Sequence, residues 1–427
     1  MLFTACSHPA QGTDGVPPGP LASVRLTATD LWSGGDITVV SASFKALATL
    51  PSVLVAGAAR PVRRIDDSTI AAQLPDTDAV MSVQVDADNY TEFQSSVTVH
   101  GFQQVRDGPL LSGFIQWIPG TTLVLGAGDV GLVEVDVRFN NVVRSWPDTV
   151  HSVDCVSGVG PSVRPGYYVL WGKTPAGVCS HPWVWQYGPT VVRTDSIANR
   201  EGNWTVAEIG PGGVIQSGNA PFTMSHCDGI TCVDFSYPLG QVTGVSISTT
   251  SRRAVLHNST SMVVNASTGD TLYRLPFTQP GQIRVEDAAF SPAGDTIYAV
   301  GTAFAAGTGA LSMVNVATGA LLAGLTLPVQ VHGVARDPIR PWIYVVGQNG
   351  RGEAQLLVLS SRTLGTLATL RGPAQPAPYG VFDRVRIVPD PRGTGVFVVA
   401  TVQGTGIHGV SSRILSFGVP VPTGVAP

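Results

Sequence analysis

Two stretches of the chain share one layout although they share few residues. "DAAFSPAGDTIYAVG" (287–301) and "GVARDPIRPWIYVVG" (333–347) each hold a short apolar strand, a turn rich in Pro, Gly or Asp, and a second strand rich in β-branched and aromatic residues. The layout recurs at 113–128 and 384–400, and more weakly at 244–258. A unit repeated in this way cannot bury its apolar faces alone, so it must stack on its neighbours.

The segment that follows each copy is repeated as well. It holds a strand, a polar turn and another strand at 132–146, 261–275, 311–325 and 356–370. Four strands therefore recur about every 40 to 50 residues, which is the period of a β-propeller blade. We count seven blades, which begin near residues 109, 150, 199, 240, 283, 329 and 379.

The last expected blade is one strand short, because the sequence pattern ends at 411–419. We expect residues 100–106, "HGFQQVR", to supply the missing strand. This pairing would close the ring with sequence from the start of the repeat region and would remove an exposed sheet edge.

Composition agrees with a chain of many short strands. The 427 residues exceed what one hydrophobic core usually organises, so two or more domains are expected. The chain has 49 glycines, 32 prolines and only 13% charged residues, which suits tight turns rather than helices. The net charge of −4 is spread along the chain and predicts no nucleic-acid partner. No apolar run is long enough to predict a transmembrane helix.

Residues 21–100 precede the repeats and alternate apolar and polar positions between turns. This alternation is clear at 36–44, 68–75, 81–87 and 95–101, and it predicts a two-sheet sandwich of immunoglobulin type. The order of features, with Gly-Gly before "ITVVSASF" and a last strand containing "VTV", resembles the IPT/TIG family. The resemblance implies a spacer or interaction module.

The whole chain is therefore expected to be all-β. An Ig-like β-sandwich at 21–100 is followed by a seven-bladed β-propeller at 101–420, with a tether at 1–20 and a tail at 421–427. The turn "SPAGD" followed by "TIYAVG" resembles the YVTN type of bacterial propeller repeat. The segment of this chain most similar to that repeat is "IYVVG". This resemblance implies a cell-surface or periplasmic protein. Related ring folds include lactonases and cofactor-bearing enzymes, so fold alone does not decide function.

The N-terminus, "MLFTACSHPAQGTDGVPPGP", places Cys6 after a small residue and before a polar Gly/Pro-rich tether. It resembles the end of a bacterial lipoprotein signal, in which the cysteine is lipidated. The charged and most of the apolar region of such a signal are missing here. Cys6 is thus expected to be a lipidation site of an exported protein, and the alternative is an ordinary thiol in a tail.

The other four cysteines form two close pairs, Cys155 with Cys179 and Cys227 with Cys232. In a chain with signs of export, such pairs predict local disulfides. The turn signal Asp228-Gly229 between the second pair would bring its flanking strands together. The alternative is a metal site, but no C-x-x-C occurs and the imidazole nearest to this pair is His226.

Polar residues at the entry to the innermost strands are the candidate ligand site, because these loops surround one mouth of a propeller channel. A ring of imidazole, guanidinium and carboxylate groups could coordinate a divalent metal or hold an anionic ligand. The alternative is that strand ends beside a wet channel are simply polar. The candidates are Arg284, Glu286, Asp287, His332, Arg336, Tyr379, Asp383 and Arg384.

Aromatic residues gather in the second expected blade. Trp183, Trp185 and Tyr187 alternate along one strand face, and Tyr167 and Trp171 lie close by in sequence. They are candidates for a surface that stacks on a glycan or binds a protein partner. Burial between blades is the commoner fate of such residues.

These patterns favour an exported, envelope-associated binding or scaffold protein whose partner is a protein or a glycan. Membrane contact is expected only through a lipid anchor at Cys6, and no cofactor is predicted beyond a divalent metal in the channel. Neither a haem-attachment motif nor a G-x-S-x-G elbow occurs. The alternative is a hydrolase of the lactonase type using the channel mouth around His332 and Asp383. The first and fourth expected blades offer few ligands beyond Asp107 and Gln241, and this shortage argues against such an enzyme.

Overall fold

The protein is described by a computed structural model that divides into two compact units. One unit contains Met1–Phe102 and Gly418–Pro427, and the other contains Gln103–Phe417. The structure describes residues 23–27, 29–32, 36–75, 79–87, 90–100, 103–109, 111–128, 131–146, 156–172, 183–189, 193–196, 205–210, 213–217, 223–228, 231–236, 242–257, 262–278, 283–303, 308–374, 382–393, 395–403 and 410–418. Cys6, Cys155, Cys179 and Tyr379 lie outside these residues.

The first unit contains two sheets and a short 3₁₀ helix at Ala42–Ala46. One sheet has the order β1 (Arg25–Leu26), β3 (Asp36–Val40), β7 (Thr69–Gln73), β6 (Val62–Asp66). The other has the order β2 (Asp30–Trp32), β9 (Tyr90–His100), β8 (Ala79–Ala87), β4 (Ser52–Val55), β5 (Ala58–Arg60).

Both sheets of the first unit contribute to one hydrophobic cluster. Ile37 and Ile70 come from β3 and β7, whereas Val53, Val83 and Val97 come from β4, β8 and β9. The alternation that the sequence predicts is present, since β8 buries every second residue from Met81 to Val85. The two sheets thus share a core, and the immunoglobulin-type and IPT/TIG assignments remain predictions.

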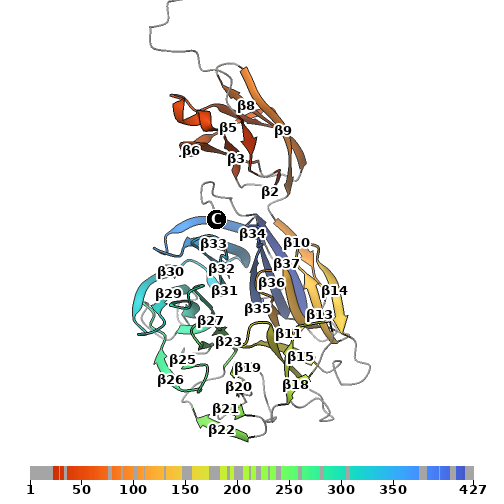
Figure 1. Cartoon of the computed structure of the whole chain (residues 1–427), viewed down its shortest axis with the longest axis vertical. Coiled ribbons are helices and arrows are strands. Elements are labelled where there is room, and N and C mark those ends of the chain that lie inside the picture. The colour runs from red at the N-terminus through yellow and green to blue at the C-terminus, as the bar shows by residue number, and fades with distance from the viewer. Residues whose placement is uncertain are drawn as a thin grey trace, which may run out of the picture. The chain divides into compact units, whose positions relative to one another are not determined.

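The second unit is built from sets of four antiparallel strands, which follow one another in sequence in every set but the last (Figure 1). The first two sets are joined by a parallel bridge into one eight-stranded sheet. Each set of four is called a sheet here and is named by its first strand. The β11 sheet contains β11 (Leu111–Trp117), β12 (Leu123–Gly128), β13 (Gly131–Asp136) and β14 (Asn141–Trp146). The β15 sheet contains β15 (Val156–Pro161), β16 (Tyr167–Gly172), β17 (Trp183–Gln186) and β18 (Arg193–Ser196). The β19 sheet contains β19 (Thr205–Gly210), β20 (Gly213–Ser217), β21 (Thr223–Asp228) and β22 (Thr231–Ser236).

The remaining sheets follow the same order in sequence. The β23 sheet contains β23 (Gly244–Ser248), β24 (Arg253–His257), β25 (Met262–Asn265) and β26 (Thr271–Arg274). The β27 sheet contains β27 (Ile283–Phe290), β28 (Thr296–Ala303), β29 (Gly309–Asn315) and β30 (Leu321–Leu327). The β31 sheet contains β31 (Gln330–Arg336), β32 (Trp342–Gln348), β33 (Glu353–Ser360) and β34 (Thr366–Ala374). The β35 sheet contains β35 (Phe382–Pro389), β36 (Gly395–Gln403), β37 (Val410–Gly418) and β10 (Gln103–Asp107).

The β35 sheet joins the two ends of the second unit. Strand β10 pairs antiparallel with β37, in a register that runs from Gln103 opposite Phe417 to Asp107 opposite Arg413. This confirms the expectation that sequence around residues 100–106 completes the last sheet. The pairing covers the edge of β37, which would otherwise present unpaired backbone groups.

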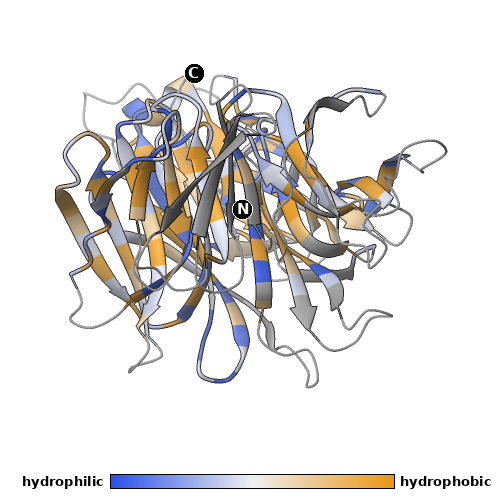
Figure 2. Cartoon of the chain, turned by 90° about the horizontal axis from the view of Figure 1, so that it is seen from below, coloured by the Kyte–Doolittle hydropathy of each residue, from blue (hydrophilic) through white to orange (hydrophobic). Residues whose placement is uncertain are grey.

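The first strands of the sheets contact one another in a closed circuit. Contacts run from β11 to β15, β19, β23, β27, β31 and β35 in turn, and from β35 back to β11. Strands β11 and β15 come close enough for a parallel bridge between Phe114 and Gly158. Gly158 is required there, since a Cβ atom would lie 2.3 Å from Cζ2 of Trp171. The first strands therefore surround a central channel. Apolar residues lie mainly on the strands, as Figure 2 shows.

The repeated turns are held by their own polar side chains. In the turn 291–296, Ser291 Oγ accepts hydrogen bonds from the backbone N–H groups of Asp295 and Thr296, both at 3.1 Å, and Gly294 adopts a φ of +71°. In the β31 and β35 sheets an Asp-Pro dipeptide serves the same purpose. Asp337 accepts from the amides of Ile339 and Arg340, at 2.8 and 2.7 Å.

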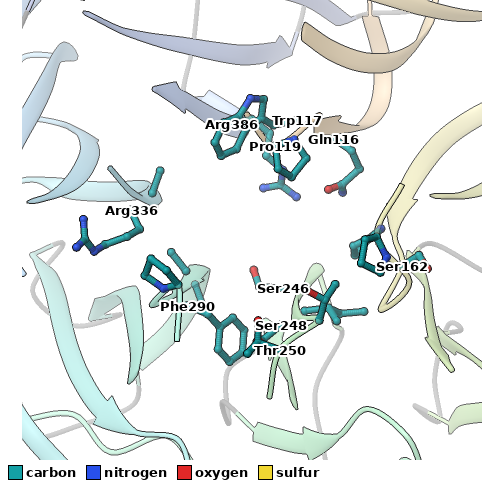
Figure 3. A pocket seen from close by; sticks show the side chains of 18 of the residues that line it. Gln116, Trp117, Pro119, Ser162, Ser246, Ser248, Thr250, Phe290, Arg336 and Arg386 are labelled. Atoms are coloured by element: carbon teal, nitrogen blue, oxygen red, sulfur yellow. The ribbon is translucent and has the colours of Figure 1, made fainter. Parts of the chain in front are cut away.

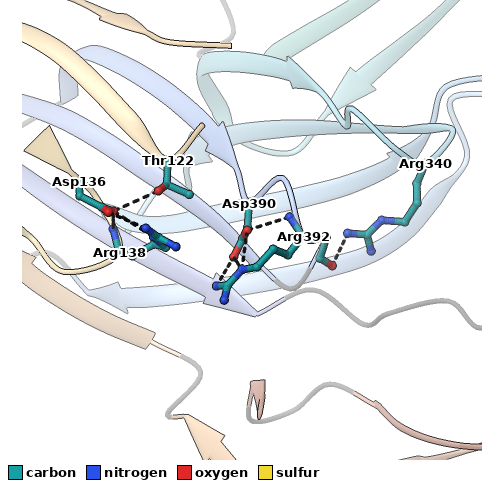
Figure 4. A network of polar contacts seen from close by, with 7 residues as sticks. Thr122, Asp136, Arg138, Arg340, Asp390 and Arg392 are labelled. Carbon is teal, nitrogen blue, oxygen red and sulfur yellow. Dashed lines mark hydrogen bonds and ion pairs between the residues drawn. The ribbon is translucent and has the colours of Figure 1, made fainter. Parts of the chain in front are cut away.

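In the β35 and β11 sheets, a carboxylate also pairs with the arginine that lies two residues further along the same turn (Figure 4). Asp390 pairs with Arg392 at 2.8 Å, and Asp136 pairs with Arg138 at 2.7 Å and accepts a hydrogen bond from Thr122. The two ion pairs join residues that are two apart in sequence. Because such contacts are local, the residues of the turns are the most recognisable part of the repeat.

Candidate functional site

The channel contains two chambers at opposite ends of the first strands. The chamber that we call the narrow chamber, of about 110 Å³, lies where β23, β27, β31 and β35 begin. The chamber that we call the wide chamber, of about 520 Å³, lies where the first strands end and their turns begin (Figure 3). Arg386 lines both chambers.

The narrow chamber brings together four of the predicted site residues, Arg284, Glu286, His332 and Arg384. They lie near the starts of strands from three different sheets. The chamber is also lined by residues that the sequence analysis missed. These are Thr243, Gly244, His257, Val385 and Arg386.

The other four predicted residues have different outcomes, and Asp287 lines the wide chamber. Arg336 lies at the end of β31 and lines the wide chamber, so its assignment to the same mouth as His332 is wrong. Its guanidinium donates to the carbonyl oxygens of Asp337 at 2.8 Å and Trp342 at 2.9 Å, which holds the following turn. Asp383 lies on β35, and the structure does not describe its side chain; Tyr379 lies outside the described residues.

A buried polar layer separates the chambers. Ser246 Oγ lies 2.9 Å from His257 Nε2 and donates to Asp287 Oδ1 at 3.3 Å. Asp287 Oδ1 lies 3.7 Å from Arg386 Nη1. Because Asp287 and Ser246 line the wide chamber and His257 lines the narrow one, this hydrogen-bonded group reaches from one chamber to the other.

The layer contains Ser, His and Asp, but their arrangement differs from a nucleophilic relay. In a relay the carboxylate holds the imidazole nitrogen that faces away from the serine. Here Ser246 and Asp287 both face Nε2 of His257, with Asp287 Oδ1 at 4.0 Å. The other nitrogen, Nδ1, faces Gly244, where a Cβ atom would lie only 2.6 Å away. The geometry therefore suits a structural hydrogen-bond group.

Burial controls the charges in this layer. It lowers the pKa of His257 to about 3, assisted by the positive charges of Arg386 and Arg384, so the imidazole is neutral at pH 7. Burial raises the pKa of Asp287, and Arg386 and the backbone amide of Val334 oppose this effect.

The narrow chamber has its own contacts. Arg284 donates from Nε to Oε1 of Glu286 at 2.7 Å. Burial raises the pKa of Glu286, while Arg284 works against the rise. Arg384 donates to the carbonyl oxygen of Thr243 and stacks over Phe114, with its Cζ 3.8 Å from the ring centroid.

His332 is the most unusual group in the narrow chamber. Burial lowers its pKa to about 4, although a side-chain hydrogen bond with Gln348 opposes the shift. Its Nε2 atom is buried and has no hydrogen-bond partner. The bond to Gln348 therefore involves the other ring nitrogen, and Nε2 is left without a partner.

No group of three or more His, Cys, Asp or Glu side chains in a geometry suited to a metal ion occurs among the described residues. The channel metal considered from the sequence remains an expectation.

The aromatic residues of the β15 sheet are mostly core residues. Trp171, Trp183 and Trp185 are buried, so the expectation of an exposed platform is wrong for these three, and burial between sheets is the outcome. Trp185 packs edge-on against Trp146 of the β11 sheet, with ring centroids 5.2 Å apart. Large aromatic surfaces stabilise most when removed from water, which explains their place between neighbouring sheets.

Tyr167 and Tyr187 are only partly buried. The hydroxyl of Tyr187 donates to Oε2 of Glu134 at 2.8 Å, which links the β15 and β11 sheets. The ring of Tyr167 lies under the guanidinium of Arg164, 4.2 Å from its centroid, and both residues line the wide chamber.

The β21–β22 hairpin places Cys227 directly opposite Cys232 in the backbone register. This is the strand pairing that the Asp-Gly turn predicts, and the disulfide itself remains a prediction. No helix in the described part of the chain has the length and apolar character needed to cross a membrane.

Comparisons with known proteins reveal structural relatives only. No family model matches the chain and no curated protein matches it. A chain of the mitotic checkpoint complex has 12% identity and a TM-score of 0.53, and the match covers 74% of this chain and 91% of that one. A chain of the hydrazine synthase of Kuenenia stuttgartiensis has 13% identity and a TM-score of 0.44, covering 60% and 79%.

The dihydro-heme d1 dehydrogenase NirN, in complex with DHE, has 12% identity and a TM-score of 0.44, and the match covers 81% of this chain and 72% of that one. At such identities a likeness shows the fold alone. Together with the circuit of first strands, the match to the mitotic checkpoint chain establishes that the second unit is a β-propeller.

Proposed function

We propose that this chain is a binding scaffold that receives a segment of a protein partner in the wide chamber of a seven-bladed propeller. The blade count follows from taking each four-stranded sheet as one blade. The circuit of first strands from β11 to β35 supports it.

The shape and lining of the wide chamber carry this proposal. Its volume of about 520 Å³ lies in the range of ligand pockets. Turns from many sheets converge on it, so a bound segment would touch several blades at once. Its lining combines apolar rings and small hydroxyl groups: Trp117, Phe290, Tyr167, Ser248 and Thr250 are among them (Figure 3). Such a mixture suits an extended peptide with both apolar and polar side chains.

The polar layer supports binding rather than chemistry at this chamber. Ser246, Asp287 and Arg386 form its floor, and their polar atoms pair with one another and with the backbone. Their pairing satisfies groups whose burial would otherwise be costly, so these atoms have a structural task.

Site-specific photo-cross-linking in the producing cells tests the proposal. A photoreactive phenylalanine replaces Phe290 in the wide chamber, and a matched control replaces Leu322, which is 51% exposed on outer strand β30. We expect a defined protein adduct from position 290 and none from position 322. Adducts from position 322 alone would place the interface on the outer strands. No protein adduct, together with binding to a glycan array, would favour the glycan alternative.

We also propose that the scaffold is exported and held at the cell envelope through Cys6, with the first unit acting as an Ig-like spacer. The lipoprotein-like sequence around Cys6 supports this. Cys6→Ser is expected to abolish incorporation of a labelled fatty acid and to release the protein from the membrane fraction. Unchanged labelling would contradict the anchor.

Export would also oxidise the hairpin cysteines. The register of Cys227 opposite Cys232 supports a disulfide between them. Mass analysis of the peptide that contains both residues, before and after reduction, is expected to show a gain of two hydrogens.

A further inference from the structure

The lining of the narrow chamber carries more positive than negative charge. Among the described residues that line the chamber, three guanidinium groups, from Arg284, Arg384 and Arg386, meet one carboxylate, Glu286. Asp287 lies behind Arg386 and balances part of its charge. The described lining therefore carries a net positive charge in a small, partly buried space, where charges interact strongly.

Donor groups remain available on Arg284 and Arg386. A guanidinium has five N–H donors. Arg284 uses its Nε and Nη2 on the same oxygen of Glu286, at 2.7 and 2.6 Å. Arg386 donates from Nε to the carbonyl oxygen of Ile115 and from Nη1 to that of Val385. These contacts hold the guanidinium planes in place and leave further N–H groups on both arginines.

His332 provides an independent sign of a ligand. A buried polar atom without a partner is costly and rare, and Nε2 of His332 is such an atom. Its ring is held from the other side by Gln348 and by edge-to-face contact with Phe382, at 5.6 Å between centroids. The imidazole is thus fixed in orientation on the wall of the chamber.

We propose that the narrow chamber binds a small oxyanion, with its oxygens held by Arg284 and Arg386 and by Nε2 of His332, which is protonated when the anion binds. The volume of about 110 Å³ suits a small group such as phosphate, sulfate or a short carboxylate. Glu286 restrains the affinity by repelling the anion, while it also holds Arg284.

Calorimetric titration of the full-length protein with inorganic phosphate, sulfate and acetate tests the site. We expect saturable binding of one anion per chain, strongest for the class that fits. Arg284→Gln removes a charged donor and should weaken binding about tenfold. Glu286→Gln removes the repelling charge and should tighten binding.

Matched variants separate binding from folding. Arg274→Gln alters an exposed arginine on outer strand β26 and should leave the dissociation constant unchanged. His332→Phe keeps a ring in place but removes Nε2, so it should weaken binding while the melting temperature in the absence of anion stays close to that of the parent. Opposite effects of Arg284→Gln and Glu286→Gln support the site. No binding of any of the three anions by the parent protein, or equal binding by all variants, overturns it. Either result leaves the cross-linking test of the wide chamber unaffected.

Discussion

The backbone amide of Val334 donates a hydrogen bond of 3.1 Å to Oδ2 of Asp287, and this bond joins the first strands of two neighbouring sheets. Oδ1 of the same carboxylate accepts from Ser246 on a third sheet and lies 3.7 Å from Arg386 on a fourth. Asp287 therefore links four first strands around the channel, and it does so while buried.

Asp287→Ala is expected to destabilise the propeller strongly. It leaves Ser246 and the Val334 amide without this acceptor and Arg386 without its counter-charge, and breaking a buried charge pair typically costs about 3 to 5 kcal/mol. Urea unfolding should show a lower midpoint, whereas Asp270→Ala, at an exposed turn, should change the free energy of unfolding by less than about 0.5 kcal/mol. Equal small effects of the two substitutions would show that the layer contributes little to stability.

Acid should destabilise the protein through His257. Its pKa falls from 6.5 in the unfolded chain to about 3 in the fold, so the unfolded state binds a proton first as the pH drops. Stability due to the neutral imidazole is complete above pH 6.5 and is lost progressively between pH 6.5 and 3. At pH 5 the loss should reach up to about 2 kcal/mol.

The check on His257 is a set of urea titrations at pH 7, 6 and 5. His257→Gln keeps a hydrogen-bonding group but cannot titrate. Its free energy of unfolding should therefore fall less steeply as the pH drops, with a slope that corresponds to about one proton fewer than in the parent. The same slope in the variant and the parent would assign the acid sensitivity to other groups, such as His332.

Gly244→Ala is expected to disturb the polar layer from its far side. The new Cβ atom would lie 2.6 Å from Nδ1 of buried His257, so the ring must move, and overpacking of this kind costs about 1 to 3 kcal/mol. Gly350→Ala is the control, because nothing lies within 4 Å of its Cβ position. Thermal melting should separate the two variants, and a melting temperature for Gly244→Ala equal to that of the control would argue against a rigid layer.

Closure of the ring by β10 can be tested with proline. In an antiparallel pair the N–H groups of successive residues point alternately toward and away from the partner strand. One of Gln104→Pro and Val105→Pro should therefore break a bond to β37 and lower the melting temperature markedly, and the other should have the smaller effect. Equal, negligible effects of both substitutions would mean that the ring is stable without this pairing.

Local sequence determined the strands and turns of this protein. The turn side chains of Ser291, Asp337 and Asp390 bond to backbone groups only a few residues away, so their pattern is readable without the fold. The alternation of apolar residues set which strands have a buried face. The source of the missing strand in the last sheet was also predictable from sequence. The last repeat lacks one strand, and the segment just before the first repeat is the one that can complete it when the ring closes.

Tertiary structure alone decided which polar side chains meet. His257 ends β24 and Arg386 lies in the middle of β35, far apart in sequence, and no local pattern distinguishes them from other strand residues. It also decided that Trp183 and Trp185 pack against the neighbouring sheet and that Arg336 belongs to the opposite end of the channel from His332. A period of two residues tells which side chains share a face. Which residues that face contacts depends on how the sheets pack around the channel axis. This packing is fixed only when the ring of first strands closes.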